Sequence, residues 1–244
     1  MQNGYAVETR NLTKRFGHFT ALDNLNLKID THAIYGLLGP NGAGKTTAIK
    51  LLCGLLKPTS GEAYVLGKKV PDRSLLPQIG YMPQETALYL DLTVHYNLSL
   101  YGELYGMSGK RIAEREKELL RFIALEKWRD APVGNLSGGM KHRVSLACSM
   151  IHEPKLLFLD EPTVGVDPEL RASFWEYFNG LKRAGVTIVL TTHYMDEAQH
   201  CDEIGLVRQG RLIAEGTPTD IIKRTRTTNL EDAFLALAGH QADA

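Results

Sequence analysis

The sequence has few cysteines, no excess of either charge and no long apolar run, and each shortage excludes a class of protein. Its three cysteines, Cys53, Cys148 and Cys201, are an odd number without paired spacing, which gives neither a disulfide framework nor a zinc motif. Lysine plus arginine and aspartate plus glutamate both number 28, so the chain lacks the basic footprint of proteins that live mainly on nucleic acid. We therefore expect buried structural thiols and no nucleic acid among the partners.

Membrane and export signals are lacking as well. The longest stretch without Asp, Glu, Lys or Arg runs from Thr31 to Gly44 and is broken by glycine and proline, whereas a membrane-spanning helix needs about 18 or more apolar residues. Residues Met1–Gly4 begin neither a basic nor an apolar signal segment, so we expect no secretory signal. A chain of 244 residues is long enough to bury a hydrophobic core without a disulfide or a metal.

Strand and helix patterns alternate along the chain, which predicts an α/β fold with a mostly parallel sheet. Two segments with alternating apolar and polar residues, Val7–Thr13 and Leu22–Ile29, predict an antiparallel sheet near the N-terminus. The other predicted strands are short apolar or β-branched runs: Ile34–Leu38, Ala63–Leu66, Ile79–Met82, Leu156–Leu159, Val186–Leu190, Ile204–Val207 and Leu212–Ala214.

Helices are predicted between these strands and in one insert. Between Leu92 and about Arg129 strand signals vanish and Arg111–Trp128 has a helical apolar face, so we expect a helical insert at about 86–150. We treat 1–244 as a single domain with a C-terminal extension at 217–244, because no repeat or long linker divides it. The other predicted helices are Thr46–Leu56, Lys141–Ile151, Pro168–Arg183, a short one near Met195–His200 and a closing amphipathic one over Leu230–Leu237.

A glycine-rich loop follows the predicted strand Ile34–Leu38. Residues Gly39–Thr46 match G-x-x-x-x-G-K-[ST] with a strand before and a helix after, a context that a glycine turn with an incidental lysine does not explain. The glycines let backbone N–H groups surround phosphate oxygens, and the helix N-terminus adds positive charge. Lys45 would bridge the β- and γ-phosphates of a nucleotide, and Thr46 would offer its hydroxyl to Mg²⁺.

Two acids end the apolar strand Leu156–Leu159. Successive strand residues point to opposite sides, so Asp160 and Glu161 can do different work. Asp160 can orient the Mg²⁺ shell beside Thr46, and Glu161 can polarise an attacking water. Alone, such a pair can equally cap a helix or face solvent. Together with the phosphate loop, it predicts nucleotide hydrolysis.

A Ser-Gly-Gly element, Ser137–Gly139, precedes the predicted helix Lys141–Ile151. Ser137 can be an N-cap and nothing more. Alternatively, its hydroxyl, the bare backbone N–H groups and the helix N-terminus form a second anion site. The residues alone leave both interpretations open.

The order of these motifs resembles that of ATP-binding cassette (ABC) ATPases over nearly the whole chain. The matching positions are Gly39–Thr46, Gln84, Leu136–Gly139, Asp160–Pro162, Asp167 and His193. The resemblance implies a phosphate-loop NTPase fold of ABC type: a mostly parallel core sheet, an N-terminal antiparallel β-subdomain and an inserted α-helical subdomain. It also implies Mg²⁺-dependent hydrolysis of ATP to ADP and phosphate, and no Asn-Lys-x-Asp guanine motif occurs.

The resemblance further implies a homodimer of two such domains that sandwiches two ATP molecules. Phe16 would stack on adenine, and Ser137, Gly138 and Gly139 of the other copy would reach the γ-phosphate, with Asp167 at the dimer seam. The residues expected to hold ATP from its own copy are Asn41, Gly42, Ala43, Gly44, Lys45, Thr46 and Thr47. Those expected at the reaction centre are the catalytic Glu161, His193 and Gln84 and the Mg²⁺ ligands Thr46, Gln84 and Asp160.

Finer motifs resemble the ATPase subunits of bacterial and archaeal drug, antibiotic or lipid exporters. They are Thr163–Pro168, Thr191–Ala198 and Asn229–Phe234. Such subunits are cytoplasmic and sit on the inner face of the membrane through a separate permease, which would be this chain's partner. The alternatives are a non-transport ABC ATPase acting in Fe–S assembly, on the ribosome or on DNA, and a regulatory nucleotide-binding module.

The sequence departs from the family pattern in three places. Met140 stands where glutamine is commonest, which leaves activity in place because the exporter branch also has methionine there. His32-Ala33 replaces a usual Gly-Glu turn, and we expect only that turn to change. Tyr96 replaces a usual glutamate near the surface that receives the membrane partner, so we expect unusual partner contacts there.

Overall fold

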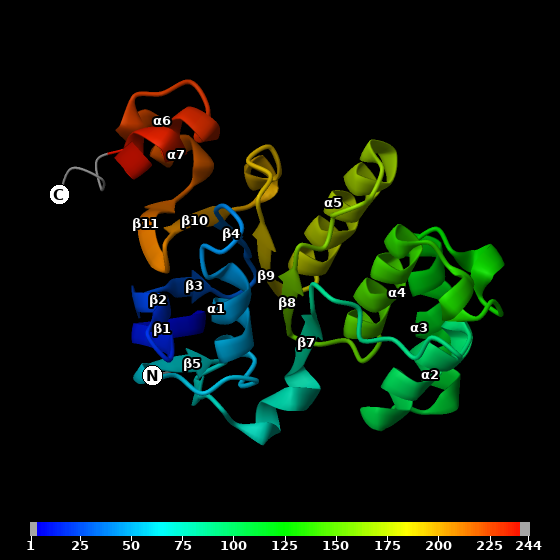
Figure 1. Cartoon of the computed structure of the whole chain (residues 1–244). Helices are drawn as coiled ribbons and strands as arrows, with labels where there is room; N and C mark the ends of the chain where they lie inside the picture. Colours follow the sequence, from blue (N-terminus) through cyan, green and yellow to red (C-terminus); the bar gives the residue numbers. More distant parts are fainter. Residues whose placement is uncertain (1–3, 240–244) are drawn as a thin grey trace.

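The computed structural model describes residues 4–239. The expectation for Met1–Gly4 and the end of the predicted extension 217–244 therefore fall mainly on residues outside the described part. Figure 1 shows a central sheet with an antiparallel sheet and one helix on one side, a group of helices on the other and a C-terminal helix pair at one end. Within residues 4–239, no helix is long and apolar enough to cross a lipid bilayer.

The central sheet has six strands in the order β11-β10-β4-β9-β8-β7. Its neighbours from β10 to β7 pair in parallel, and β11 is antiparallel to β10, which confirms the mostly parallel core sheet. All residues of β4, β8 and β9 are buried, which explains their unbroken apolar character in the sequence. The strands are β4 (Ile34–Leu38), β7 (Ile79–Met82), β8 (Leu156–Asp160), β9 (Thr187–Thr192), β10 (Glu203–Arg208) and β11 (Arg211–Gly216).

The predicted antiparallel sheet is confirmed, with one correction. Its strands are β1 (Tyr5–Phe16), β2 (Phe19–Leu25), β3 (Lys28–Asp30), β5 (Ser60–Val65) and β6 (Lys68–Lys69). The single strand predicted at Leu22–Ile29 is wrong, because the chain leaves β2 at Asn26 and re-enters the sheet as β3. The Asn26 side chain accepts a hydrogen bond from the Asn11 N–H at this break. The alternation of apolar and polar residues continues across this break, because Leu25, Leu27 and Ile29 are all buried.

The helices account for the rest of the described chain. They are α1 (Lys45–Leu52), α2 (Val94–Leu104), α3 (Gly109–Phe122), α4 (Gly138–Met150), α5 (Pro168–Arg183), α6 (Pro218–Thr225) and α7 (Leu230–Gly239), with 3₁₀ helices η1 (Arg73–Gln78), η2 (Glu126–Trp128), η3 (Val133–Asn135) and η4 (Glu197–His200). Helices α2, α3 and α4 lie within the predicted insert 86–150, and α6 and α7 lie within the predicted extension.

Several predicted helix limits need correction. The helix predicted at Thr46–Leu56 ends at Leu52, before Gly54 takes a left-handed φ of 73°. The helix predicted at Arg111–Trp128 ends at Phe122, because Ala124 has a φ of 53° and the chain restarts as η2. Helix α6 was not predicted, and the segment near Met195–His200 is the 3₁₀ helix η4.

Two apolar clusters pack on the opposite faces of the central sheet. Leu156 and Phe158 of β8 pack with α1 and the antiparallel sheet, whereas Leu157 and Leu159 pack with the helices of the other side. This alternation follows from the two-residue period of a strand. The carboxyl ends of β4, β8 and β9 are thereby held at one edge, where the predicted site residues follow them.

Candidate functional site

The phosphate loop joins the end of β4 to α1. Gly44 has a φ of 106°, and a Cβ there would lie 2.5 Å from the Ala21 carbonyl oxygen, so the loop requires glycine at this point. The Lys45 side chain is buried against its own loop, where Nζ donates hydrogen bonds to the carbonyls of Gly39 at 2.7 Å and Pro40 at 3.2 Å. Burial lowers the pKa of the Lys45 ammonium, and the nearby charges of Glu161 and Asp160 oppose that effect.

A cavity of about 240 Å³ opens over this loop. Its lining brings together nine of the predicted residues with two others: Asn41, Gly42, Ala43, Gly44, Lys45, Thr46, Thr47, Gln84 and Glu161, joined by Phe19 and Ala21. Phe16, predicted to stack on adenine, does not line this cavity. It pairs with Phe19 across the β1–β2 hairpin, and the Lys14 ammonium lies 4.9 Å from the centre of its ring.

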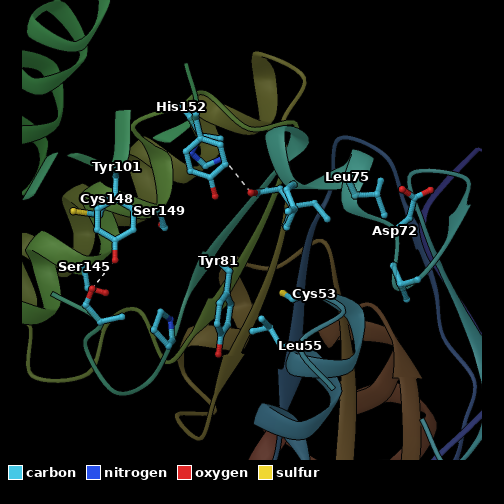
Figure 2. A pocket seen from close by; sticks show the side chains of 16 residues that line it. Cys53, Leu55, Asp72, Leu75, Tyr81, Tyr101, Ser145, Cys148, Ser149 and His152 are labelled. Atoms are coloured by element: carbon cyan, nitrogen blue, oxygen red, sulfur yellow. Dashed lines mark hydrogen bonds between the residues drawn. The ribbon is translucent and has the colours of Figure 1, made fainter. Parts of the chain in front are cut away.

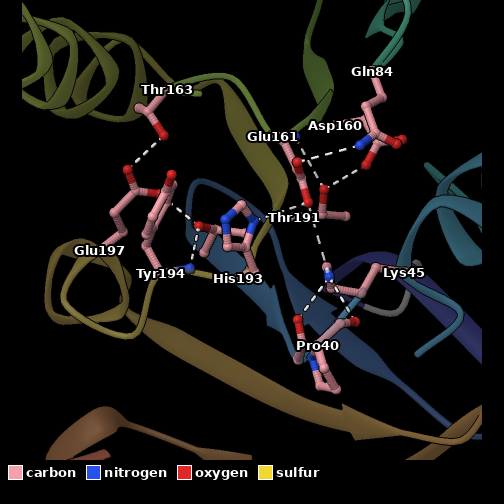
Figure 3. A network of polar contacts seen from close by, with 12 residues as sticks. Pro40, Lys45, Gln84, Asp160, Glu161, Thr163, Thr191, His193, Tyr194 and Glu197 are labelled. Atoms are coloured by element: carbon pink, nitrogen blue, oxygen red, sulfur yellow. Dashed lines mark hydrogen bonds and ion pairs between the residues drawn. The ribbon is translucent and has the colours of Figure 1, made fainter. Parts of the chain in front are cut away.

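Three of the predicted residues converge on the carboxylate of Glu161 (Figure 3). Gln84 Nε2 donates to Oε2 at 3.3 Å, His193 Nδ1 lies 3.2 Å from Oε1, and Lys45 Nζ lies 4.0 Å from Oε1. Because a carboxylate only accepts, the His193 contact places the imidazole proton on Nδ1. The side chain of Glu161 is 9% exposed, so these contacts act in a largely dehydrated setting.

The backbone of Glu161 is held in an uncommon conformation. Its φ of 57° lies in the left-handed region, which costs a side-chain-bearing residue about 1–2 kcal/mol. The Glu161 N–H lies between two acceptors of Thr191, the carbonyl at 3.2 Å and the hydroxyl at 3.0 Å. The surrounding contacts therefore impose this conformation, as is common at functional sites.

Asp160 is fully buried beside Glu161. Its Oδ1 accepts a hydrogen bond from the Thr191 hydroxyl at 2.5 Å, and its Oδ2 has no hydrogen-bond partner within residues 4–239. A buried carboxylate oxygen without a partner is costly, and a cation beside it removes that cost. Across the described residues no cluster of three or more His, Cys, Asp or Glu side chains is placed to bind a metal. Mg²⁺ suits such a site because it binds through one or two protein oxygens, substrate phosphates and water.

The Ser-Gly-Gly element lies outside this cavity. Ser137 caps α4, since its Oγ accepts a hydrogen bond from the Met140 N–H at 3.2 Å, and it is exposed. The loop that leads to Asp167 passes close by, because a Cβ on Gly139 would lie 2.9 Å from the Gly165 carbonyl oxygen. Asp167 in turn caps α5 through the Leu170 N–H at 3.0 Å. None of these residues lines the phosphate-loop cavity of the same chain, so the predicted roles of Ser137, Gly138, Gly139 and Asp167 towards ATP remain predictions.

The fold adds two site residues that sequence reasoning missed. Thr191, at the end of β9, bonds both acids, and its only signal was a polar residue closing an apolar strand. His142, on α4, lies 2.9 Å through Nε2 from the Glu161 carbonyl oxygen. A carbonyl only accepts, so Nε2 carries the proton, and the histidine links α4 to the Glu161 segment. No local signal marked it.

We expect His142 to make the stability of the protein depend on pH. Burial lowers the pKa of His142, opposed by its hydrogen bond to Glu161 and by the Glu161 charge. Its contribution to the free energy of unfolding is complete above the unfolded-state pKa near 6.5 and is lost as pH falls through the lower folded-state value. We expect thermal unfolding at pH 7.5 and 5.5 to show a larger acid loss in the wild type than in His142→Gln, whose amide donates the same bond without titrating.

His152 serves as the internal reference for this measurement. Burial lowers its pKa as well, and it titrates equally in both proteins. An exposed replacement, His18→Gln, is the matched control and should keep the wild-type dependence. Equal acid losses in the wild type and His142→Gln would show that folding does not lower the pKa of His142 and would contradict the assignment.

The sequence is similar to one family profile and to named proteins. The sequence profile described as ABC transporter matches residues 22–164. A probable multidrug ABC transporter ATP-binding protein, YbhF of Escherichia coli, is 44% identical over 95% of this chain, which spans 41% of that protein. The Nod factor export ATP-binding protein I of Cupriavidus metallidurans is 43% identical over 88% of this chain and 72% of its own length. The chain thus spans less than half of the first relative.

Solved structures give the same result for the fold. An ATP-binding subunit of an ABC transporter superposes with a TM-score of 0.88 at 31% identity, covering 96% of this chain and 99% of its own. A dimeric ATP-binding cassette in a post-hydrolysis state, bound to ADP and Pi, superposes with a TM-score of 0.80 at 29% identity, covering 86% and 98%.

Proposed function

Because the chain belongs to the ABC transporter family as an ATP-binding domain, we propose that it is the ATP-hydrolysing subunit of an exporter, dimeric and paired with a separate permease. The observation that carries the proposal is the convergence of Lys45, Gln84 and His193 on Glu161 beside the phosphate loop. A relative that shares 43% of residues is named for Nod factor export and another for multidrug transport, which favours the exporter branch. The export role, the cargo and the permease are parts of this proposal.

The proposed reaction is attack of water on the γ-phosphate of ATP. The phosphate loop and Lys45 would hold the β- and γ-phosphates, which is mostly positioning and charge neutralisation. Glu161 would accept the proton of the attacking water as the P–O bond to ADP breaks. His193 Nδ1–H and Gln84 would hold that carboxylate in place. When bound, Mg²⁺ would supply positive charge at the phosphates, with Thr46, Gln84 and Asp160 as its protein ligands.

The dimer follows from the separation of the two half-sites. Ser137 and Gly138 are exposed and do not line the cavity of their own chain, so a second copy would be needed to bring them to a γ-phosphate. Neither half-site is complete alone, so ATP would join the two copies and hydrolysis would release them. A dimeric cassette among the structural neighbours supports this arrangement. We propose a homodimer with Asp167 at its seam.

A second cavity offers a surface for the permease. It has a volume of about 330 Å³ and lies between the end of α1, β7 and helices α2 and α4 (Figure 2). Its lining is mostly apolar and includes Leu55, Leu76 and Tyr105, all at least 37% exposed. Tyr96, the departure noted in the sequence, is 60% exposed on α2. Exposed apolar patches of this kind mark protein interaction sites.

Purification from native membranes in mild detergent tests the proposal. We expect a polytopic membrane protein to accompany the chain at near-stoichiometric yield, which mass spectrometry would identify. Recovery only in the soluble fraction with ribosomal, DNA-associated or Fe–S assembly proteins would support the non-transport alternative and overturn export. ATP hydrolysis by the purified chain, measured separately, tests the enzyme half of the proposal. The same experiment shows whether the chain is peripheral on the inner face of the membrane.

A negative charge introduced into the second cavity should weaken binding of the proposed permease. We expect Leu55→Glu and Leu76→Glu to reduce the recovered membrane protein about tenfold or more, because a carboxylate in an apolar interface loses its hydration. ATP binding should stay unchanged, since neither residue lines the phosphate-loop cavity. Leu235→Glu is the matched control: Leu235 is 66% exposed on α7. Equal recovery with all three variants would place the partner elsewhere.

A further inference from the structure

A buried carboxylate lies behind the proposed reaction centre and is not explained by it. Glu197, the first residue of η4, is 2% exposed. Its Oε1 accepts a hydrogen bond from the Thr163 hydroxyl at 2.5 Å, and its Oε2 accepts one from the Thr192 hydroxyl at 2.7 Å (Figure 3). Each carboxylate oxygen is thus bound to a different segment of the chain.

The two threonines belong to the two segments that carry the proposed machinery. Thr163 follows Glu161 by two residues and lies in the loop that ends at Asp167. Thr192 directly precedes His193, and its hydroxyl also accepts the Tyr194 N–H at 3.0 Å, which fixes the turn that carries the histidine. Through these two threonines, Glu197 connects the Glu161 loop to the His193 turn. His193 and Glu161 also contact each other directly.

The loop between Glu161 and Asp167 is short and internally bonded. The Val164 N–H donates to the Glu161 carbonyl at 3.3 Å, and the Val166 N–H donates to the Thr163 carbonyl at 3.2 Å. We expect these two successive turns to couple a displacement at Asp167 to Thr163. A displacement at the proposed dimer seam would thus reach Glu197.

Arg171 of α5 spans the same two segments. Its Nη2 donates to the Val166 carbonyl at 3.3 Å, its guanidinium carbon lies 5.5 Å from the centre of the Tyr194 ring, and its Nε lies 3.8 Å from Glu197 Oε1. The positive charge compensates the buried carboxylate from beyond hydrogen-bond range. The two threonine hydroxyls therefore supply its direct hydrogen bonds, and hydrogen bonds to a charged acceptor are the stronger kind.

We propose that Glu197 is a positioning residue that joins the Glu161–Asp167 loop to the His193 turn as one rigid unit, so that closure at the dimer seam aligns His193 with Glu161. This inference rests on the proposed ATPase function. Without Glu197 both threonine hydroxyls lose their acceptor inside the protein, and the two segments can move independently. ATP binding itself belongs to the phosphate loop, which Glu197 does not contact.

Steady-state kinetics of three replacements test the proposal: Glu197→Gln, Thr163→Val and Thr192→Val. We expect each to lower kcat about 10- to 100-fold, because an ångström of misplacement of a catalytic group costs about that much. KM for ATP should stay within about twofold. Thr163→Ser, which keeps the hydroxyl, should restore kcat. The Thr163→Val, Thr192→Val double variant should lose less than the product of the single losses, because both threonines act through one carboxylate.

Glu215→Gln is the matched control. Glu215 is a partly buried carboxylate that accepts the Tyr35 hydroxyl at 2.7 Å, and it lies on β11, away from the phosphate-loop cavity. It should keep wild-type kcat even where it lowers the melting temperature. Wild-type kcat in Glu197→Gln, or equal losses in Thr163→Ser and Thr163→Val, would overturn the inference. An inactive wild-type chain would instead overturn the proposed function on which it rests.

Discussion

Replacing Glu161 with glutamine is expected to keep ATP bound and to reduce its hydrolysis about 10²- to 10⁴-fold, the contribution of a general base. Glutamine has the shape of glutamate, so the cavity over the phosphate loop and the contact with Gln84 can persist. It cannot take the proton of the attacking water. ATP would then hold the two copies together without being consumed. Steady-state ATPase assays and size-exclusion chromatography with ATP and Mg²⁺ measure both effects.

The replacement is well matched to its site. The contacts of Glu161 through backbone atoms, with Thr191 and His142, do not depend on the carboxylate and remain. Glu169→Gln, an exposed position in the first turn of α5, serves as the control and should behave as wild type. A normal rate in Glu161→Gln would refute the general-base assignment. Weakened ATP binding would mean that the glutamate charge, 4.0 Å from Lys45 Nζ, holds the lysine in place.

Replacing Ser137 with arginine is expected to reduce turnover about 10²- to 10³-fold, as loss of a transition-state donor does, with nucleotide binding unchanged. Ser137 is exposed and is not among the described residues that line the cavity of its own chain, so ATP would still bind there. In the proposed dimer the longer arginine side chain would stand between the two half-sites and keep them from closing around the other copy's γ-phosphate. Nucleotide binding by fluorescence and turnover by phosphate release separate the two effects.

Loss of the helix cap must be distinguished from loss of the composite site. Ser137→Arg removes an N-cap, worth about 1 kcal/mol. Ser108→Arg removes the exposed N-cap of α3, whose Oγ accepts the Arg111 N–H at 3.3 Å, and should keep full activity.

Mixing two inactive variants gives the sharper test of a composite site. Lys45→Ala disables the phosphate loop and Ser137→Arg disables the other half-site, so their heterodimer contains one intact site and should recover activity. Unchanged activity in Ser137→Arg, or no recovery on mixing, would contradict a composite site.

The core strands could be predicted because burial on both faces leaves an unbroken apolar run, as in Ile34–Leu38 and Ile79–Met82, which are strands with those limits. The limits of other strands and helices could not be predicted. The break at Asn26 was invisible because both flanking strands bury the same face. Within the described residues of helix α6, Ile221 is the one that is buried, so the apolar pattern was too weak to predict a helix there. In the turn before β4, His32 has a left-handed φ of 60° where the family usually has glycine.

The phosphate loop could be predicted from the sequence, because a site made of consecutive residues takes its geometry from local backbone preferences. Gly39–Thr46 forms it with a glycine where no side chain fits. Which distant groups meet at this loop depends on how the chain folds in three dimensions. Gln84 and Glu161 are 77 residues apart in the chain, and their contact exists because β7, β8 and β9 end at one edge of the sheet.

Strand register determined where the threonines of β9 lie relative to the acidic residues. Pairing of Asp160 with Thr191 places that threonine between the two acids, and it places Thr192 over Glu197. Phe19 lines the cavity and Phe16 does not, although the two residues pair across the β1–β2 hairpin. Side-chain direction along a strand alternates with every residue, so these choices follow from how the strands pair and not from which residues they contain.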